Sequence, residues 1–183
     1  MEIDNSLLKN RIIFLNGEVD NNSSYDVISK LLYLDSISNE DISLYINSFG
    51  GSVISGLAII DTMNLIKSDV CTYCIGACYS MAAIILSCGK KGKRFSLCNS
   101  EIMIHQPSGY ASGKADDVSI TSNRLDKTKE KLTSILVKNT NKSKKEINKY
   151  LSYDKYFDSN EALDIGLIDN IIKSYWFKNT IMI

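Results

Sequence analysis

Ser80 is the residue of this sequence whose surroundings best suit a nucleophile. Apolar, aromatic and β-branched residues at 70–75 predict a buried strand, and the apolar run 81–86 predicts a short helix. Ser80 is therefore expected at a strand-to-helix transition, with its hydroxyl and the free N–H groups of the helix N-terminus facing the same ligand. That arrangement suits a nucleophile whose intermediate carries a negative oxygen. Capping the helix is the ordinary role of serine at such a position, and this stretch alone leaves it open.

The candidate base for Ser80 is His105, the single histidine of the chain. A serine hydroxyl needs a base within hydrogen-bond reach and a third group that orients the base. His105 follows an alternating pattern at residues 101–104 and precedes Gln106 and Pro107, and strand ends commonly present side chains to a cleft. A structural histidine is the alternative. Spacing does not identify the acid, because 21 Asp and Glu residues compete for that role.

A glycine pair, Gly50 and Gly51, follows a second predicted strand at residues 42–46. Consecutive glycines let backbone N–H groups approach a ligand closely. Together with the N–H of Met81, this turn could form an oxyanion hole, although a tight helix-start turn would also use small residues. The nucleophile motif of the α/β-hydrolases, Gly-x-Ser-x-Gly, is not present, since residues 78–82 read Cys-Tyr-Ser-Met-Ala.

Strand and helix patterns alternate along the chain, which predicts an α/β fold with parallel strands and helical crossovers. The predicted strands are residues 11–19, 42–46, 70–75, 95–98, 101–105 and 167–172. The predicted helices are residues 21–34, 52–66, 81–86, 114–138, 143–152 and 160–166. The segment 107–113, with one proline and two glycines, is a predicted loop.

The predicted helix at about 114–138 is long and sparsely apolar. Val118, Leu125 and Leu132 recur seven residues apart and form one narrow stripe. Such a stripe is too narrow for a core element, so we expect an arm that packs against a neighbouring molecule. A solvated surface helix is the alternative.

Composition and charge restrict the class of protein. A chain of 183 residues with 44% hydrophobic residues suits one domain, residues 1–183. The 21 basic and 21 acidic residues cancel, so no overall field favours nucleic acid or an anionic membrane. No secretory signal or membrane-spanning run is apparent, which predicts a soluble intracellular protein. The five cysteines are expected to be free thiols in a reducing compartment, and Cys71-x-x-Cys74 lacks the partners of a metal site.

These residues together resemble the ClpP family, the serine peptidase subunit of the Clp protease, from about residue 7 to residue 170. Several motifs occur in the family's order at compatible spacing, which makes the resemblance specific. They are Asn47-Ser-Phe-Gly-Gly51 with Gly56 and residues 61–63, Gly76-Ala-Cys-Tyr-Ser80-Met81, Lys93-Arg-Phe95 with Asn99-Ser100, Met103-Ile-His105-Gln-Pro107, and Asp154-Lys-Tyr-Phe with Glu161-Ala162 and residues 166–169.

The resemblance implies a serine endopeptidase and a role for each site residue. It implies Ser80 as nucleophile, His105 as base and Asp154 as the group that orients the base. The N–H groups of Gly51 and Met81 would form the oxyanion hole. A peptide substrate would lie as an added strand between two backbone segments, whose residues are Ser52 and Val53 on one side and Ser108, Gly109 and Tyr110 on the other.

The resemblance also implies an architecture and a set of partners. The fold would be the crotonase-like α/β fold of this family, with helix 114–138 as a protruding handle that joins two stacked heptameric rings. Substrates would be unfolded polypeptides and short peptides, cleaved mainly after apolar residues. An AAA+ Clp ATPase would supply unfolded chains and use the ATP, so this chain would need no cofactor and no metal. The plastid stroma or the bacterial cytoplasm is the implied compartment.

The sequence departs from the family pattern at several positions. Phe49 stands where a proline usually precedes the glycine pair. Cys78 and Tyr79 replace two small residues, so Tyr79 is expected either to crowd the site or to point into the core. Tyr153 replaces a basic residue before the triad aspartate, which bears on coupling between rings. The chain begins close to its first strand, so we expect the family's upstream axial segment, which gates the pore, to be missing.

Two other classes of protein are compatible with parts of this sequence. A catalytically silent ring subunit of the ClpR type would keep the architecture and lose the chemistry. The presence of all three triad residue types favours the peptidase. An acyl-CoA enzyme of the crotonase type would share the fold, but the serine and histidine constellation argues against it.

Overall fold

Seven strands form one sheet in the computed structural model, which describes residues 2–173. The strands are β1 (Ile12–Val19), β2 (Ile42–Gly51), β3 (Val70–Tyr79), β4 (Arg94–Leu97), β5 (Glu101–Ile104), β6 (Lys155–Asp158) and β7 (Asn170–Ile172). The helices are α1 (Glu2–Lys9), α2 (Asn21–Ile37), α3 (Val53–Leu65), α4 (Met81–Ser87), α5 (Ala115–Asn139), α6 (Lys144–Leu151) and α7 (Ser159–Ile165).

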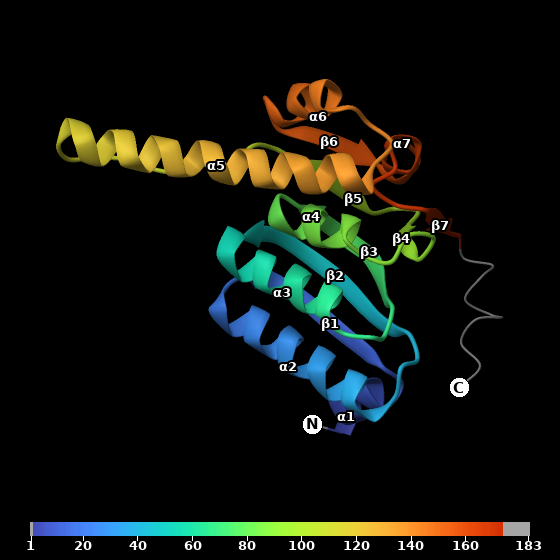
Figure 1. Ribbon diagram of the computed structural model, residues 1–183. Coiled ribbons are helices and arrows are strands. Elements are labelled where there is room, and N and C mark those ends of the chain that lie inside the picture. The colour runs from blue at the N-terminus through green and yellow to red at the C-terminus, as the bar shows by residue number, and fades with distance from the viewer. Residues whose placement is uncertain (1, 174–183) are drawn as a thin grey trace.

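The sheet is parallel along its main path, β1-β2-β3-β4-β7. Strand β3 divides its second edge between two partners, because residues 72–74 pair with β4 and residues 77–79 pair with β5. Strand β6 then joins β5 in the antiparallel sense. The predicted α/β class with parallel strands and helical crossovers is confirmed. Figure 1 shows helices α2, α3 and α4 together on one side of strands β1 to β3.

The face of the sheet opposite α2, α3 and α4 carries aromatic side chains in register. Phe14, Tyr45, Tyr73 and Phe95 are paired across β1, β2, β3 and β4. Their ring centroids are 5.4, 4.5 and 4.8 Å apart in succession, and each pair is stacked. Alternation along a strand places these side chains opposite the buried Leu44 and its neighbours.

Strand β3 contains a bulge and does not end at residue 75 as predicted. Cys74 pairs with Ile46 and Cys78 pairs with Ser48, so four residues of β3 advance against two of β2. Gly76, with φ +83°, lies in the bulge, where the Ala77 N–H donates to the Asn47 side-chain oxygen over 3.2 Å. The Asn47 side chain thus bonds a backbone N–H that the bulge displaces. Pairing with β2 then resumes, and β3 continues to Tyr79.

Other element boundaries also differ from the prediction. Helix α1 and strand β6 were not predicted, because an eight-residue helix and a four-residue strand are too short for a hydrophobic pattern to repeat. Strand β2 continues through its glycine pair to Gly51. The predicted strand 167–172 is ordered as a strand only from Asn170, because Leu167 and Ile168 lie buried in the turn that follows α7.

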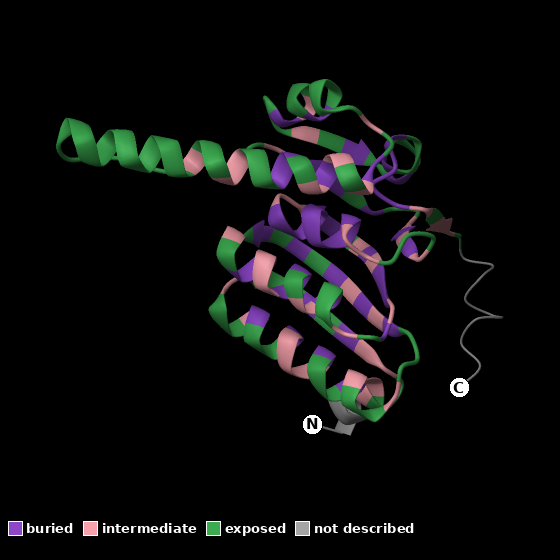
Figure 2. Cartoon of the chain, in the orientation of Figure 1, coloured by how far each residue is buried: buried purple, intermediate pink, exposed green. Residues whose placement is uncertain are grey.

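Helix α5 consists of an inner part in the core and an exposed outer part. It extends well beyond the rest of the chain in Figure 1, and its outer residues are exposed in Figure 2. Every residue from 115 to 124 is exposed, whereas Leu132 and Leu136 belong to the hydrophobic core. The expectation of a helix too sparsely apolar for the core is therefore wrong at Leu132. The inner part is a core element, and the outer part alone is an arm.

A buried ion pair ties the end of the sheet to two helix ends. Arg94 is 1% exposed, and its guanidinium binds both oxygens of Asp169 at 2.6 and 2.8 Å. It also donates to the carbonyl of Ser87 at the end of α4 and to that of Asn139 at the end of α5. Arg94 therefore neutralises Asp169 and satisfies helix-terminal carbonyls in one place.

One hydrophobic core contains residues from β1 to α7. The predicted single domain, residues 1–183, also includes residues 1 and 174–183, which lie outside the described residues, so its full extent stays a prediction. No helix within residues 2–173 is long and apolar enough to cross a membrane. The five cysteines are free, and Cys71, Cys74 and Cys78 are buried as expected.

Candidate active site

Ser80 occupies the junction between β3 and α4, as predicted. Its backbone has φ 54° and ψ −121°, a conformation that residues other than glycine rarely adopt. Although Ser80 is the N-terminal boundary residue of α4, its side chain makes no capping hydrogen bond. The alternative that its hydroxyl serves to cap the helix is wrong, and the hydroxyl is free for another partner.

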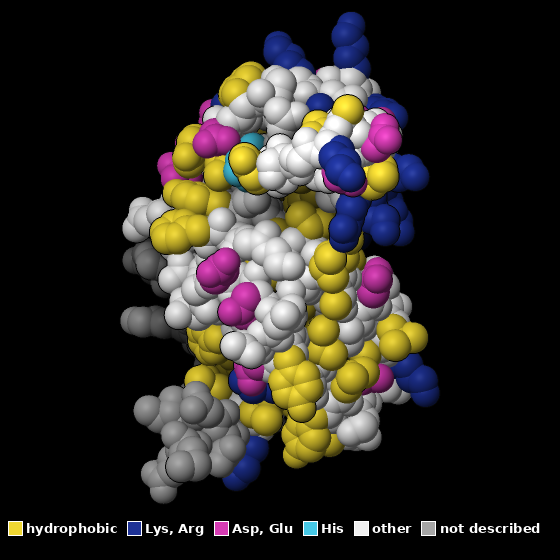
Figure 3. All heavy atoms as spheres, turned by 90° about the vertical axis from the view of Figure 1, so that its left-hand side faces the viewer, with side chains coloured by type: hydrophobic (Ala, Val, Ile, Leu, Met, Phe, Trp, Pro, Cys, Tyr) yellow, Lys and Arg dark blue, Asp and Glu magenta, His cyan; other side chains and the backbone are white. Residues whose placement is uncertain are grey.

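That partner is His105. The Nε2 atom of His105 lies 2.8 Å from Ser80 Oγ, and its Nδ1 atom lies 2.9 Å from an oxygen of Asp154. The side chains of His105 and Asp154 are 28% and 58% exposed, so this row of three groups opens to solvent. Figure 3 shows the histidine at the surface with acidic and hydrophobic side chains around it. The structure therefore brings the three predicted residues together in the order that nucleophilic catalysis requires.

Pairing of β5 with β6 explains how Asp154 reaches His105. The antiparallel register places Ile104 opposite Lys155, so the next positions outward, His105 and Asp154, face each other. The serine is fixed to the same strand, because its N–H donates to the carbonyl of Met103 over 2.8 Å. Spacing in the sequence could not single out Asp154, because the short strand that positions it lies far along the chain from β5.

The glycine pair lies directly against the nucleophile. A Cβ atom on Gly50 would lie 2.7 Å from the Tyr79 carbonyl oxygen, 2.8 Å from Ser80 Cβ and 3.0 Å from the Met81 nitrogen. Gly51 is adjacent to Val19 on the neighbouring strand β1. Gly50 is thus the residue whose missing side chain permits the close approach, whereas the sequence pattern pointed only to the pair as a whole.

The residues predicted to contact substrate lie on two segments that flank the site in the chain. Ser52 is the N-cap of α3, and its hydroxyl oxygen accepts the N–H of Ser55 over 3.2 Å. Ser108, Gly109 and Tyr110 are exposed in an irregular segment after β5, and the ring of Tyr110 is 87% exposed. Residues 108–110 lie outside any helix or strand, which suits the predicted addition of a peptide strand. On the other side, the Ser52 N–H already donates to the Val19 carbonyl over 2.7 Å, and Val53 is the first residue of α3.

Tyr79 neither crowds Ser80 nor points into the core. Its ring lies near those of Phe49 and Tyr156, and its hydroxyl donates to the carboxylate of Glu101. Tyr153, the other substituted position, is 54% exposed beside Asp154. The hydrogen bond to Glu101 raises the pKa of Tyr79 to about 12, so its hydroxyl stays a donor at neutral pH.

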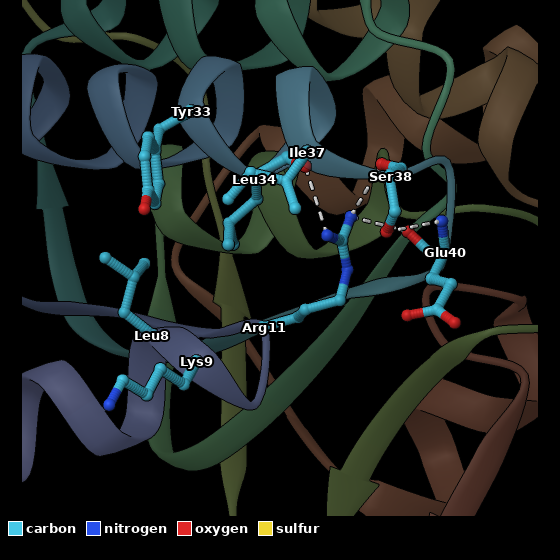
Figure 4. A pocket seen from close by; sticks show the side chains of 8 residues that line it. All are labelled: Leu8, Lys9, Arg11, Tyr33, Leu34, Ile37, Ser38 and Glu40. Atoms are coloured by element: carbon cyan, nitrogen blue, oxygen red, sulfur yellow. Dashed lines mark hydrogen bonds between the residues drawn. The ribbon is translucent and has the colours of Figure 1, made fainter.

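A hollow lies far from this site, at the opposite edge of the sheet. It has a volume of about 500 Å³, and Figure 4 shows it between α1 and the end of α2, around Arg11. Arg11 precedes β1, whereas Ser80 follows β3, and parallel strands place these ends at opposite edges. The guanidinium of Arg11 is already bound by the carbonyls of Leu34, Ser38 and Glu40, so the hollow offers little free polar chemistry.

No group of three or more histidine, cysteine, aspartate or glutamate side chains within the described residues could hold a metal ion. The site itself supplies a serine hydroxyl, an imidazole and a carboxylate. A hydrogen-bonded row of these groups beside a close-packed glycine turn is suited to acyl transfer.

Comparison with known proteins identifies the family. A family model described as Clp protease matches residues 1–175. The ATP-dependent Clp protease proteolytic subunit of Carsonella ruddii (strain PV) is 46% identical over 176 residues, which cover 96% of this chain and 91% of that relative. The chain belongs to the Clp protease family. The predicted resemblance is confirmed, and the crotonase-like α/β fold expected of a Clp protease agrees with the sheet and helices described above.

Membership in the Clp protease family makes this chain a serine peptidase. The family match covers the segments that carry Ser80, His105 and Asp154. It also covers Phe49 and Tyr79, so these departures from the family pattern occur within a Clp protease rather than outside it.

Proposed function

We propose that Ser80, His105 and Asp154 form the catalytic triad with which this chain hydrolyses peptide bonds. The observation that carries the proposal is the pair of bonds to one imidazole, 2.8 Å to Ser80 Oγ and 2.9 Å to Asp154. When His105 donates its Nδ1 proton to the Asp154 carboxylate, Nε2 is left as an acceptor for the serine proton. Asp154 thereby fixes the tautomer that a general base needs.

The proposed reaction proceeds in two acyl transfers. Ser80 Oγ attacks the carbonyl carbon of the scissile bond while its proton passes to His105 Nε2, and the carbonyl oxygen becomes an oxyanion. Collapse of this intermediate breaks the C–N bond, the amine takes the proton from Nε2, and an ester remains on Ser80. Water then attacks the ester by the same route and releases the carboxylate product and the free serine.

The proposed oxyanion hole consists of the N–H groups of Gly51 and Met81. Support comes from the close packing of the glycine turn against the Met81 nitrogen, which leaves no room for a side chain at Gly50. Donors held this way are oriented before the charge develops, and one such donor is worth about 10²–10³ in rate. The substrate is proposed to lie as an added strand between residues 52–53 and residues 108–110.

We further propose that this chain acts as one subunit of stacked heptameric rings joined through α5. The outer part of α5 supports this, because Val118 and Ile120 are exposed on an arm with few contacts to its own domain. The named relative is the proteolytic subunit of an ATP-dependent protease. By analogy, an AAA+ Clp ATPase would deliver unfolded polypeptides, and this chain itself would use neither a cofactor nor a metal. A soluble location inside the cell, in the bacterial cytoplasm or the plastid stroma, is part of the same proposal.

The decisive experiment compares wild type with Ser80→Ala on a fluorogenic peptide that has an apolar residue before the scissile bond. Labelling by a serine-directed β-lactone, followed by mass spectrometry, reports the nucleophile. We expect Ser80→Ala to lose labelling and to lower kcat by about 10³-fold or more. Ser36→Ala, a change at an exposed serine of α2, is the matched control and should behave as wild type.

A catalytically silent subunit of the ClpR type is the competing function, and the same experiment separates the two. Such a subunit would assemble into rings, as measured by sedimentation, but would show neither turnover nor labelling. Equal activity in wild type and Ser80→Ala would instead mean that another group or a contaminant carries the reaction. Either result would remove the triad proposal.

A further inference from the structure

Four side chains on the strands that carry the active site form a continuous row, which we call the four-strand row: Phe49, Tyr79, Met103 and Tyr156. Phe49 lies on β2, Tyr79 on β3, Met103 on β5 and Tyr156 on β6. The ring centroids of Phe49 and Tyr79 are 5.2 Å apart, and those of Tyr79 and Tyr156 are 5.6 Å apart in an edge-to-face arrangement. The row therefore connects four strands by side-chain contact.

Met103 is the buried member of the row. It pairs with Tyr79 on one side and with Tyr156 on the other, and its side chain is only 6% exposed although β5 lies between two tyrosines at the surface. The two tyrosine rings therefore meet over the methionine. The edge-to-face contact between the two rings, made over a buried side chain, favours one relative position of the three strands.

A hydrogen bond anchors the central ring. The Tyr79 hydroxyl donates to the carboxylate of Glu101, which lies on β5 two residues before Met103. Tyr79 is thus held to β5 by its hydroxyl and by main-chain pairing, and its ring contacts that of Phe49 on β2.

Each member of the row is one or two residues from a group of the proposed site. Phe49 precedes the glycine pair, Tyr79 precedes Ser80, Met103 is two residues before His105, and Tyr156 is two residues after Asp154. Successive residues of a strand point to opposite faces. Gly50 faces Ser80, so Phe49 points away from the nucleophile. Met103 and Tyr156 are each two residues from His105 and Asp154, so alternation places them on the same face of the sheet as those two residues, one repeat farther along each strand.

We propose that the four-strand row is a positioning brace that sets the distances among the glycine turn, Ser80, His105 and Asp154. The inference rests on the proposed function, because it concerns the alignment of that triad. His105 and Asp154 sit at strand ends, and Asp154 is more than half exposed, so local packing around the triad is thin. The side-chain contacts of residues one or two positions away along each strand supply the rigidity. Phe49, Tyr79, Met103 and Tyr156 are positioning residues and touch no reacting atom.

The test measures kcat and KM of Tyr156→Ala and Tyr79→Ala on the fluorogenic peptide, with the β-lactone labelling rate as a second readout. Because the row connects the strands that carry the triad, its loss should misalign the reacting groups. We therefore expect kcat and the labelling rate to fall about tenfold, with KM within about twofold of wild type. Tyr156→Phe keeps the edge-to-face ring contact and should restore wild-type kcat. Tyr25→Ala, at a 75% exposed tyrosine of α2, is the matched control and should leave kcat unchanged.

The outcomes separate the brace from the proposed function. If Ser80→Ala abolishes turnover but both tyrosine variants keep wild-type kcat, the brace is wrong and the triad stands. If Ser80→Ala has no effect, the proposed function fails, whatever the tyrosine variants do. Sedimentation and circular dichroism accompany each assay. Loss of assembly in both tyrosine variants would overturn the brace in favour of a role in subunit contact, whereas low kcat in assembled Tyr156→Ala supports it.

Discussion

At Ser80 the chain adopts a backbone conformation that costs about 1–3 kcal/mol for a residue with a side chain. The surroundings hold it there, because the Ser80 N–H is bound by the Met103 carbonyl and Gly50 packs against its Cβ. The same strained turn aims the hydroxyl at His105 rather than at the free N–H groups of α4. Strain and the absent capping bond are therefore two aspects of one local arrangement.

Gly50→Ala tests the close approach at this turn. The new Cβ would lie 2.7 Å from a main-chain oxygen and 2.8 Å from Ser80 Cβ, so the glycine turn or the nucleophile must shift. We expect kcat on the fluorogenic peptide to fall by about 10²-fold, the effect of losing one oxyanion donor. Gly92→Ala is the control, because Gly92 has a similar φ of +88° and a Cβ added there would meet no atom within 4 Å. Equal loss of activity in both variants would contradict a specific role for Gly50.

Asp154→Asn tests the orienting carboxylate. An asparagine of the same shape cannot hold His105 in the tautomer that accepts the serine proton, so we expect kcat to fall by about 10²–10⁴-fold. Adding His105→Ala to this variant should lower kcat little further, because the members of a triad act as a unit. Asp164→Asn, at an exposed aspartate of α7, should retain wild-type kcat. Independent, multiplicative losses at the two positions would argue against a triad.

At the scale of elements, the Arg94–Asp169 pair joins β4 to the turn before β7 and to the ends of α4 and α5. Asp169→Ala leaves the guanidinium of Arg94, which is 1% exposed, without its counter-charge. We expect the free energy of unfolding to fall by about 3–5 kcal/mol, measured by urea denaturation. Asp26→Ala, which breaks the exposed pair with Lys30, should cost about 0–1 kcal/mol.

The same carboxylate gives the fold a defined sensitivity to acid. Burial alone would raise the pKa of Asp169, but the hydrogen bonds and charge of Arg94 outweigh burial and hold that pKa below its usual value. A depressed carboxylate pKa contributes stability above the unfolded-state value of about 3.9, and the contribution is lost as the pH falls through the folded-state pKa. Wild type should therefore lose stability more steeply than Asp169→Asn below about pH 4. Parallel curves for the two proteins would contradict this assignment.

The strand–helix alternation could be predicted from the sequence, because apolar runs such as residues 70–75 and 81–86 show it locally. The candidate general base could also be limited to His105, because the chain has one histidine. Asp154 could not be found from the residues alone, since its place depends on pairing between two four-residue strands far apart in the chain. The family resemblance supplied it. The bulge at Gly76 was missed for the same reason, because Asn47 on another strand stabilises it.

At the scale of the whole molecule, helix α5 divides into a part that folds the domain and a part directed away from it. The apolar stripe at Val118, Leu125 and Leu132 looked uniform in the sequence. Burial distinguishes its members, since Leu132 is 3% exposed and Val118 is 37% exposed. Leu125 lies between these extremes and is next to Gly109 in the loop that follows β5. Periodicity shows which face of a helix is apolar, but not how far along the helix the rest of the protein reaches.

Two variants of α5 should therefore have different effects. Val118→Lys combined with Ile120→Lys changes exposed positions, so we expect an unchanged free energy of unfolding and a loss of double rings in sedimentation. Leu132→Ala creates a cavity in the core and should cost about 2–5 kcal/mol of stability. Intact double rings in the lysine variant would remove the proposed role of the arm in assembly.

The outer ten residues of α5, 115–124, are all exposed, so little of their own domain stabilises them as a helix. The inner part of α5 nucleates the helix, but helical stability in proteins comes mostly from packing of an apolar face, which this segment lacks within its own domain. In the proposed assembly, contact with another subunit supplies the missing free energy. Order in the arm then depends on how many subunits are present: dilution alone should fray this segment while the domain stays native, and concentration should restore it.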